Sequence, residues 1–263
     1  MSNTTNVYYD LEGTSLETYA FNLETKGGSL KGTPAPRGDN RGIPFQHGKR
    51  YVPKYRDSRI LTFQMWVIGQ TEDGAIPSNR VLEFEENWAK LADMFDFEGQ
   101  KTLTKRWIDL SDGVTVRSAA AEVEYNSGLE PTFFAKSGAK FSPSLLLADP
   151  WFYGGVENIT VDGTAKTIKG THASDRMVIT FAGGTNPSVT IAGRTLAYDG
   201  SPGGNDVVID VQERSAIRNS IYVNGLITVD RTSPDWLSLP VGSTTPTKTG
   251  GGTVTIAYYP RYR

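Results

Sequence analysis

Histidine and cysteine are the residues that most often carry nucleophilic or metal chemistry, and this chain has few of either. Its 263 residues include two histidines, His47 and His172, and no cysteine. A disulfide framework, a thiolate nucleophile and a cysteine metal site are therefore excluded. The sequence has no HExxH motif, no Gly-Lys-Ser/Thr phosphate loop and no GxSxG elbow. We expect no catalytic residue, no cofactor and no metal ligand, and we interpret both histidines as loop or turn residues.

Pairs and groups of carboxylates are the next candidates for chemistry. Glu122 and Glu124 alternate along a predicted strand, and a glycosidase needs two carboxylates that flank a bound sugar. A simpler interpretation is that the two glutamates lie on the solvent face of this strand. Asp199, Asp206 and Asp210 surround the sequence SPGGND but lack the ligand spacing of an EF-hand. A turn rich in Gly, Asn and Asp explains that stretch.

Aromatic residues are abundant, with 5 Trp, 12 Tyr and 11 Phe. Aromatic rings on a β-sandwich can stack on sugars, so glycan binding is one interpretation of them. We expect Trp151, Phe152 and Tyr153 to pack at a domain junction instead. The pattern leaves the role of Tyr258, Tyr259 and Tyr262 open.

Charge is distributed unevenly along the chain. The formal net charge is −2 and the isoelectric point is near 5.8, which is not typical of a general nucleic-acid binder. Residues 26–59 nevertheless carry nine basic and two acidic residues, a net charge of +7. Two interpretations stay open: a solvated loop, or a contact with an acidic face of a neighbouring copy. On the second interpretation the candidate interface residues are Arg37, Arg41, Lys49, Arg50, Lys54, Arg56 and Arg59.

The elements that would position these residues are mostly strands. In the first half, period-two alternation predicts a strand over 19–24 and another over 59–69, with Leu61, Phe63, Met65 and Val67 facing the core. Prolines between them exclude a central strand. Apolar residues at helical spacing predict one helix at about 77–96, starting near Pro77 and Ser78. The residues of its apolar face are Val81, Phe84, Trp88, Leu91 and Phe95. Two strands, over TLTKRWIDL and VTVRSAAAEVEY, follow it.

The second half reads as short strands separated by turns. Strand-like runs cover 177–181, 188–193, 195–200, 206–211, 220–223, 226–230, 236–239 and 253–259. Asn224–Gly225 predicts a tight type I′ hairpin between two of these runs. The pattern favours a β-sandwich. We expect a mainly β protein with two domains, 1–149 and 150–263, divided near DPWFYG.

The order of these features resembles the distal tail proteins of siphophages, also called minor tail proteins. The resemblance rests on the early strand, the basic stretch ending in GIPFQHGKRYVPKYRDSRILTFQMWVIG, the helix around Trp88, and the second-half sequences GGTNPSVTIAG, SPDWLSLPVG and GGGTVTIAYYPRYR. It implies an N-terminal split β-barrel-like, ring-forming domain with one helix and a C-terminal galectin-like β-sandwich.

The same resemblance implies a structural virion protein. Such a protein forms a hexameric ring, a homo-oligomer, at the distal tail tip of a long non-contractile bacteriophage tail. The ring joins the tail tube protein to the hub, baseplate or fibre proteins, and DNA passes through its lumen without specific binding. The chain has no recognisable secretory signal and no run of about 18 apolar residues. We therefore expect synthesis in the host cytoplasm, no membrane partner and a final location in the virion.

Two rival functions follow from the same residues. A carbohydrate-binding module would attach the tail to host cell-wall glycan through the C-terminal sandwich. A wall-degrading enzyme would need an acid–base or metal constellation, and the sequence offers none that is conspicuous.

Overall fold

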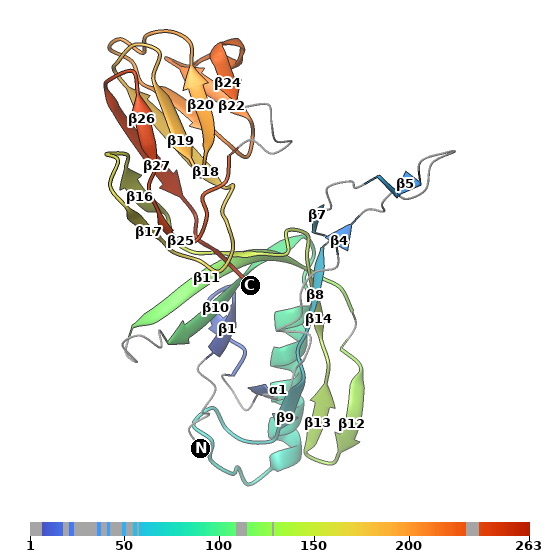
Figure 1. The fold of residues 1–263 in the computed structure, drawn as a ribbon. Helices are drawn as coiled ribbons and strands as arrows, with labels where there is room; N and C mark the ends of the chain where they lie inside the picture. The colour runs from blue at the N-terminus through green and yellow to red at the C-terminus, as the bar shows by residue number, and fades with distance from the viewer. Residues whose placement is uncertain are drawn as a thin grey trace. The chain divides into compact units, whose positions relative to one another are not determined.

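A computed structural model describes residues 7–17, 21–23, 36–37, 41–42, 49–50, 55–56, 58–108, 115–127, 129–229 and 237–263. Between 21 and 56 it describes the backbone alone. The chain divides into an N-terminal unit, residues 1–152 with Arg263, and a C-terminal unit, residues 153–262. The described part is mainly β with one α-helix, as the sequence predicts (Figure 1).

The N-terminal unit contains two antiparallel sheets. The first has the order β2-β1-β10-β11-β14-β8, and the second has the order β12-β13-β9-β3. The strands of the first sheet are β1 (Val7–Leu11), β2 (Thr14–Ser15), β8 (Arg59–Thr62), β10 (Gln100–Ile108), β11 (Val116–Tyr125) and β14 (Ser144–Leu147). Those of the second are β3 (Phe21–Leu23), β9 (Met65–Ile68), β12 (Pro131–Ala135) and β13 (Gly138–Phe141). β15 (Phe152–Tyr153) spans the boundary between the two units.

The strand predicted over residues 59–69 is two strands in different sheets. β8 pairs with β14 in the first sheet, while β9 pairs with β13 and β3 in the second. The predicted alternation nevertheless holds through the break, because Leu61, Phe63, Met65 and Val67 are all fully buried. The chain therefore crosses from one sheet to the other without losing the face that points to the core.

The predicted helix is confirmed as α1 (Arg80–Phe95), which lies along β9 (Figure 1). It begins after Pro77 and Ser78, because the Asn79 side chain caps it by accepting a hydrogen bond from the Leu82 amide. Phe84, Leu91 and Phe95 are buried as expected.

Two positions of α1 differ from the predicted apolar face. Val81 is exposed, and Asn87 takes a fully buried position instead. The Asn87 side-chain amide donates to the carbonyl oxygens of Ile68 at 3.0 Å and Gln70 at 2.8 Å, so it ties the helix to the end of β9. A buried amide with such partners is stable at a position where hydrophobic periodicity alone predicts an apolar residue.

The C-terminal unit is a β-sandwich. One sheet has the order β16-β27-β18-β21-β22-β23 and the other has the order β24-β20-β19-β26, with β17 pairing with β25 beside them. The six strands of the larger sheet are β16 (Glu157–Thr160), β18 (Met177–Ala182), β21 (Val207–Asp210), β22 (Ser215–Arg218), β23 (Ile221–Tyr222) and β27 (Thr253–Tyr258). The others are β17 (Lys166–Ile168), β19 (Ser188–Ile191), β20 (Arg194–Tyr198), β24 (Ile227–Val229), β25 (Gly242–Thr244), β26 (Thr247–Thr249) and β28 (Arg261–Tyr262).

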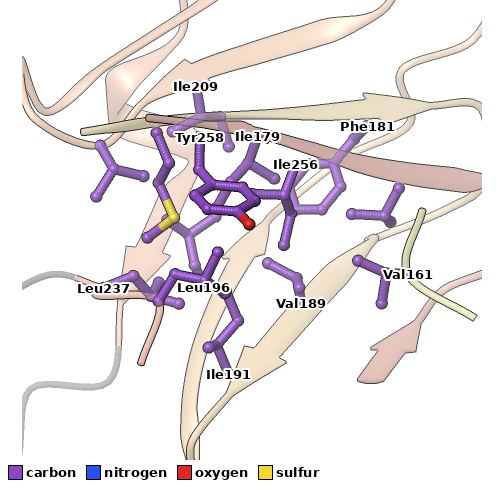
Figure 2. Packing of buried hydrophobic residues seen from close by; sticks show 14 of the residues in the cluster. Val161, Ile179, Phe181, Val189, Ile191, Leu196, Ile209, Leu237, Ile256 and Tyr258 are labelled. Carbon is purple, nitrogen blue, oxygen red and sulfur yellow. The ribbon is translucent and has the colours of Figure 1, made fainter. Parts of the chain in front are cut away.

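The core of this sandwich forms where the two sheets face each other. Figure 2 shows Ile179, Phe181 and Ile256 of the larger sheet opposite Val189 and Leu196 of the smaller one. Tyr258 lies among them with 1% of its surface exposed, and its hydroxyl accepts a hydrogen bond from the Lys169 amide. Alternate residues of β18 are buried in the order expected for a strand with one face on a core.

The predicted Asn224–Gly225 hairpin is wrong. Residues Asn224–Leu226 form a short 3-10 helix, η2, and the strands on either side of it belong to different sheets. The Asn224 side chain accepts a hydrogen bond from the Ala216 amide at 2.6 Å, which holds the segment on β22 rather than in a two-residue turn. The predicted strand over 236–239 is also absent from its described part, where Leu239 makes only an isolated bridge with Ser174.

Two further short ladders lie in the basic segment. β4 (Pro36–Arg37) pairs with β7 (Tyr55–Arg56), and β5 (Arg41–Gly42) pairs with β6 (Lys49–Arg50). The pairing is antiparallel in both cases. The two ladders are nested, so the segment doubles back on itself between residues 36 and 56.

Candidate subunit interface

The nested ladders bring most of the predicted interface residues together. Arg37 lies opposite Tyr55, Arg56 lies opposite Pro36, and Arg41 lies directly opposite Arg50. Like charges at directly opposed positions destabilise an antiparallel pair. This segment therefore concentrates positive charge in an arrangement that an acidic partner would stabilise. Lys49 belongs to the same ladder as Arg50, and Lys54 lies outside the described residues.

Arg59 differs from the other six predicted interface residues. It begins β8, and 5% of its surface is exposed. Burial lowers the pKa of its guanidinium, which faces the Tyr9 hydroxyl and Arg263. Burial also raises the pKa of Tyr9 to about 12, against the opposing effect of Arg59. An arginine buried in its own chain is not available to a neighbour, so we remove Arg59 from the candidate interface.

A block of opposite charge follows the basic segment in the sequence. Residues 72–98 contain eight carboxylates and two basic residues, a net charge of −6. On α1 the carboxylates lie away from the buried face, and Glu85, Glu86 and Asp93 are exposed. The net charge of this block is readable from the sequence, but its exposure as one surface depends on α1 burying its opposite side.

A cleft of about 480 Å³ adjoins the second half of α1. Its lining includes Glu12, Glu72 and Asp93 together with the apolar side chains of Leu11 and Met94. Two lysines also line it, Lys90, whose Nζ lies 3.4 Å from a Glu72 carboxylate oxygen, and Lys101, whose Nζ lies 4.6 Å from the centre of the Phe97 ring.

Apolar side chains are exposed near the start of α1. Val81 and Leu82 are exposed on the helix, and Phe133 and Phe134 are exposed on β12, the edge strand of the second sheet. The Phe134 ring lies edge-on to Phe84 of α1, with ring centres 5.8 Å apart. Phe133 lies on the other face of this sheet, against Trp66 at 5.8 Å between ring centres, so only Phe134 of the two adds to the exposed apolar side chains of α1.

The residues considered for catalysis do not form a reactive group in the described part of the chain. The His172 Nδ1 atom lies 3.0 Å from the Thr171 hydroxyl, and His47 is outside the described residues. Within the described ranges, no three His, Asp or Glu side chains are placed to hold a metal, and that includes Asp199, Asp206 and Asp210. No helix among the described residues is long and apolar enough to span a membrane.

Glu122 and Glu124 lie on the solvent side of β11, as predicted. Glu122 accepts a hydrogen bond from the Thr102 hydroxyl, and Glu124 accepts one from the Gln100 side chain at 3.1 Å. Thr102 and Gln100 are their register partners on β10. The two glutamates therefore make cross-strand contacts.

The aromatic residues at the ends of the C-terminal unit form a cation–π cluster. The Arg176 guanidinium lies 4.8 Å from the centre of the Tyr153 ring and 4.6 Å from that of Tyr259. Arg261 pairs with Asp175 and donates to the Tyr153 hydroxyl at 3.3 Å. Tyr153 and Tyr259 thus hold together the first and last segments of the unit.

The outer face of the larger sheet in the C-terminal unit carries almost no charge. Alternation and register place the side chains of Thr255, Thr180, Val208, Ile217 and Tyr222 in one row across it. Asp210 is the one charged residue among the outward-facing positions of the six strands: Asn158, Thr160, Val178, Thr180, Ala182, Val208, Asp210, Ser215, Ile217, Tyr222, Thr253, Thr255 and Ala257.

Comparison with solved structures shows what the fold resembles. The crystal structure of SPP1 Dit (gp 19.1), described as a paradigm of the hub adsorption apparatus in phages that infect Gram-positive bacteria, matches with a TM-score of 0.62 and 14% identity, over 98% of this chain and 99% of that chain. Chains of the phage P2 baseplate in its activated conformation with Ca and with Sr match with TM-scores of 0.39 and 0.37, identities of 6% and 8%, and coverage of 96% or more of each chain.

No family model matches the sequence, and no curated protein is significantly similar to it.

Proposed function

We propose that this chain is a structural, non-enzymatic protein of a phage tail tip, a distal tail protein of a siphophage. The observation that carries the proposal is the fold shared with SPP1 Dit over nearly the full length of both chains. A match of that extent covers both units of this chain, so it does not rest on the C-terminal β-sandwich alone. The sequence resemblance, made from independent features, points to the same class of protein.

In this role the chain forms a hexameric ring that joins the tail tube to the hub, baseplate or fibre proteins. A closed ring of identical copies needs a heterologous interface, in which two different surfaces of each copy meet. The chain offers two surfaces of opposite sign, the basic segment 26–56 and the acidic block 72–98. The basic segment is the proposed contact, with Arg37, Arg41, Lys49, Arg50, Lys54 and Arg56 as its charged residues.

Mass measurement of the purified chain tests this function. We expect the wild type to give a hexameric mass by native mass spectrometry and light scattering, and rings by electron microscopy. The triple variant Arg50→Glu, Lys54→Glu and Arg56→Glu should stay folded, with unchanged circular dichroism, and remain monomeric. A wild-type chain that is a monomer at every concentration would contradict the ring. A triple variant that forms normal rings would contradict the role of the basic segment.

A second function is favoured by the uncharged outer face of the C-terminal sandwich. Tyr222 is 71% exposed at the edge of this face, and Ile217 and Val208 separate it from the hydroxyls of Thr180 and Thr255 in the same row. An exposed tyrosine ring can stack on a sugar, and hydroxyl groups can hydrogen-bond to it, so the face suits a neutral polysaccharide. Co-sedimentation of the full chain with insoluble host cell wall tests this function. Binding that Tyr222→Ala abolishes supports it, and an unbound wild type contradicts it.

A further inference from the structure

The acidic face of α1 has no role in folding the helix. The opposite side of α1 holds it to the second sheet through Phe84, Leu91 and Asn87, which are buried. Glu85, Glu86 and Asp93 project from the free side. Lys90 lies four residues after Glu86 and three before Asp93, so it offsets part of this charge, and it also pairs with Glu72. The carboxylates remain in excess on this side, and an excess of one sign repels itself. The face therefore gains from a cationic partner.

The cleft beside α1 extends this acidic face. Asp93 belongs to both, and Glu12 and Glu72 line the cleft on the side of β1 and the loop before the helix. Lys90 is engaged by Glu72, and Lys101 lies over the Phe97 ring. A guanidinium entering this cleft would meet carboxylates beside the apolar side chains of Leu11 and Met94, which suit the methylene stem of an arginine.

The exposed apolar residues near α1 supply contact area that can be buried in an interface, which charged residues alone do not. An exposed ion pair contributes roughly 0–1 kcal/mol, so an interface held by charge alone is weak. Leu82 of α1 and Phe134 of β12, whose ring contacts Phe84 of the helix, offer exposed apolar area on the side of the acidic face. The basic segment carries apolar residues among its charges, in GIPF (42–45) and YVPKY (51–55). The two surfaces are complementary in charge and in apolar content.

We propose that the acidic outer face of α1, with the adjoining cleft and the β12 edge, receives the basic segment 26–56 of a second copy of this chain. The inference rests on the proposed function and deepens it by naming the surface that the basic segment contacts. The net charges of the two segments, +7 for residues 26–59 and −6 for residues 72–98, nearly cancel across such a contact. One basic and one acidic surface per copy is the minimum that a heterologous ring needs.

A pair of charge-reversed variants tests this contact. The acidic-segment variant carries Arg50→Glu, Lys54→Glu and Arg56→Glu, and the basic-helix variant carries Glu85→Lys, Glu86→Lys and Asp93→Lys. The substitutions lower the net charge of residues 26–59 from +7 to +1, or bring that of residues 72–98 from −6 to 0, and each variant alone places like charges together at the substituted positions, so each should be monomeric. In an equimolar mixture the substituted positions pair opposite charges when the two variants alternate. We expect the mixture to regain the wild-type ring mass, with equal amounts of the two variants in native mass spectra.

The controls separate this inference from the proposed function. The variant Asp199→Lys, Asp206→Lys and Glu213→Lys makes the same charge change at exposed carboxylates of the C-terminal unit, and it should assemble like the wild type. Circular dichroism and thermal unfolding establish that each variant is folded. If the wild type forms rings and the basic-helix variant also does, or if the mixture stays monomeric, α1 is not the receiving surface and the ring itself stands. If the wild type forms no oligomer, both the proposed function and the inference fail. A basic segment that lay on α1 of its own chain would give this result.

Discussion

The two units of this chain use charge in different ways. The C-terminal unit, residues 153–262, contains nine acidic and nine basic residues and is neutral. Several of its charges pair locally, as Lys169 does with Glu157 at 2.6 Å and Lys166 with Asp162 at 2.7 Å. The N-terminal unit instead separates its charges into a basic and an acidic block along the sequence.

This difference shows which charges serve the fold and which do not. Local pairs between neighbouring strands and turns are satisfied inside one copy, and each contributes little to stability. Blocks of one sign gain little within the unit and repel themselves. They are useful when the opposing surface belongs to another molecule. If the chain forms the proposed ring, these blocks place the contacts in the N-terminal unit, and we expect charge changes there to affect oligomers more than folding.

Gly69 provides the largest test of how the N-terminal unit holds α1. A Cβ atom on Gly69 would lie 2.0 Å from the Arg80 carbonyl oxygen, and a backbone atom cannot move aside as a side chain can. We expect Gly69→Ala to displace the start of α1 and to lower stability by about 3 kcal/mol, the upper range for overpacking. Calorimetry should show a lower melting transition for the N-terminal unit and an unchanged one for the C-terminal unit.

Gly155→Ala is the matched control for this prediction. A Cβ atom there has open space around it and no backbone strain to overcome. It should change neither transition. A Gly69→Ala variant as stable as the wild type would mean that the close approach of Gly69 to Arg80 does not fix the position of α1. The position of the acidic face would then not be fixed by this contact either.

The sequence predicted the elements better than it predicted their connections. Hydrophobic alternation correctly identified the buried side of residues 59–69, and helical spacing correctly identified α1. The same patterns could not reveal that residues 59–69 cross between two sheets, because both strands turn the same side to one core. The hairpin predicted at Asn224–Gly225 is wrong because the Asn224 side chain accepts a hydrogen bond from the Ala216 amide. The sequence shows the local turn preference of Asn-Gly but does not show this hydrogen bond.

Several strands that lack clear alternation were missed. β1 and β14 are the mainly apolar runs VYYDL and SLLL, which have no period of two. β22, β25 and β26 contain few large apolar side chains, so they show no clear alternation either. Their hydrogen-bonded neighbours define them as strands. For the candidate interface, the sequence predicted the basic residues but included Arg59, whose burial in the folded unit a count of charges along the chain cannot reveal. It missed the acidic surface because that surface exists only once α1 buries its other side.

Tyr9 gives the N-terminal unit a dependence on alkaline pH. Its pKa is raised to about 12 by burial, above the value of 10.0 expected in the unfolded chain. The stability that depends on the neutral phenol is complete below pH 10 and is lost as pH rises toward 12. We expect the free energy of unfolding to fall by about 1.3 kcal/mol more between pH 9 and pH 11 in the wild type than in Tyr9→Phe.

Urea denaturation at the two pH values measures this difference. Burial also raises the pKa of Tyr258 in the C-terminal unit, so the wild type should lose stability in both units. Tyr9→Phe should reduce the pH dependence of the N-terminal transition, to which the raised pKa of Tyr125 also contributes, and leave the C-terminal transition as it was. Equal pH dependence in the variant and the wild type would exclude Tyr9 as the source.

The smallest effect concerns a local pair of the neutral unit, and it completes the comparison. Lys169→Ala removes the pairing of its side chain with Glu157 but keeps the backbone hydrogen bond from residue 169 to the Tyr258 hydroxyl. Because the pair is partly exposed, we expect unfolding to become easier by about 0.5 kcal/mol or less, with no change in oligomeric mass. Thermal unfolding and light scattering measure the two quantities. A local pair that altered assembly would show that charge in the C-terminal unit also faces a partner, and the division of roles between the units would not hold.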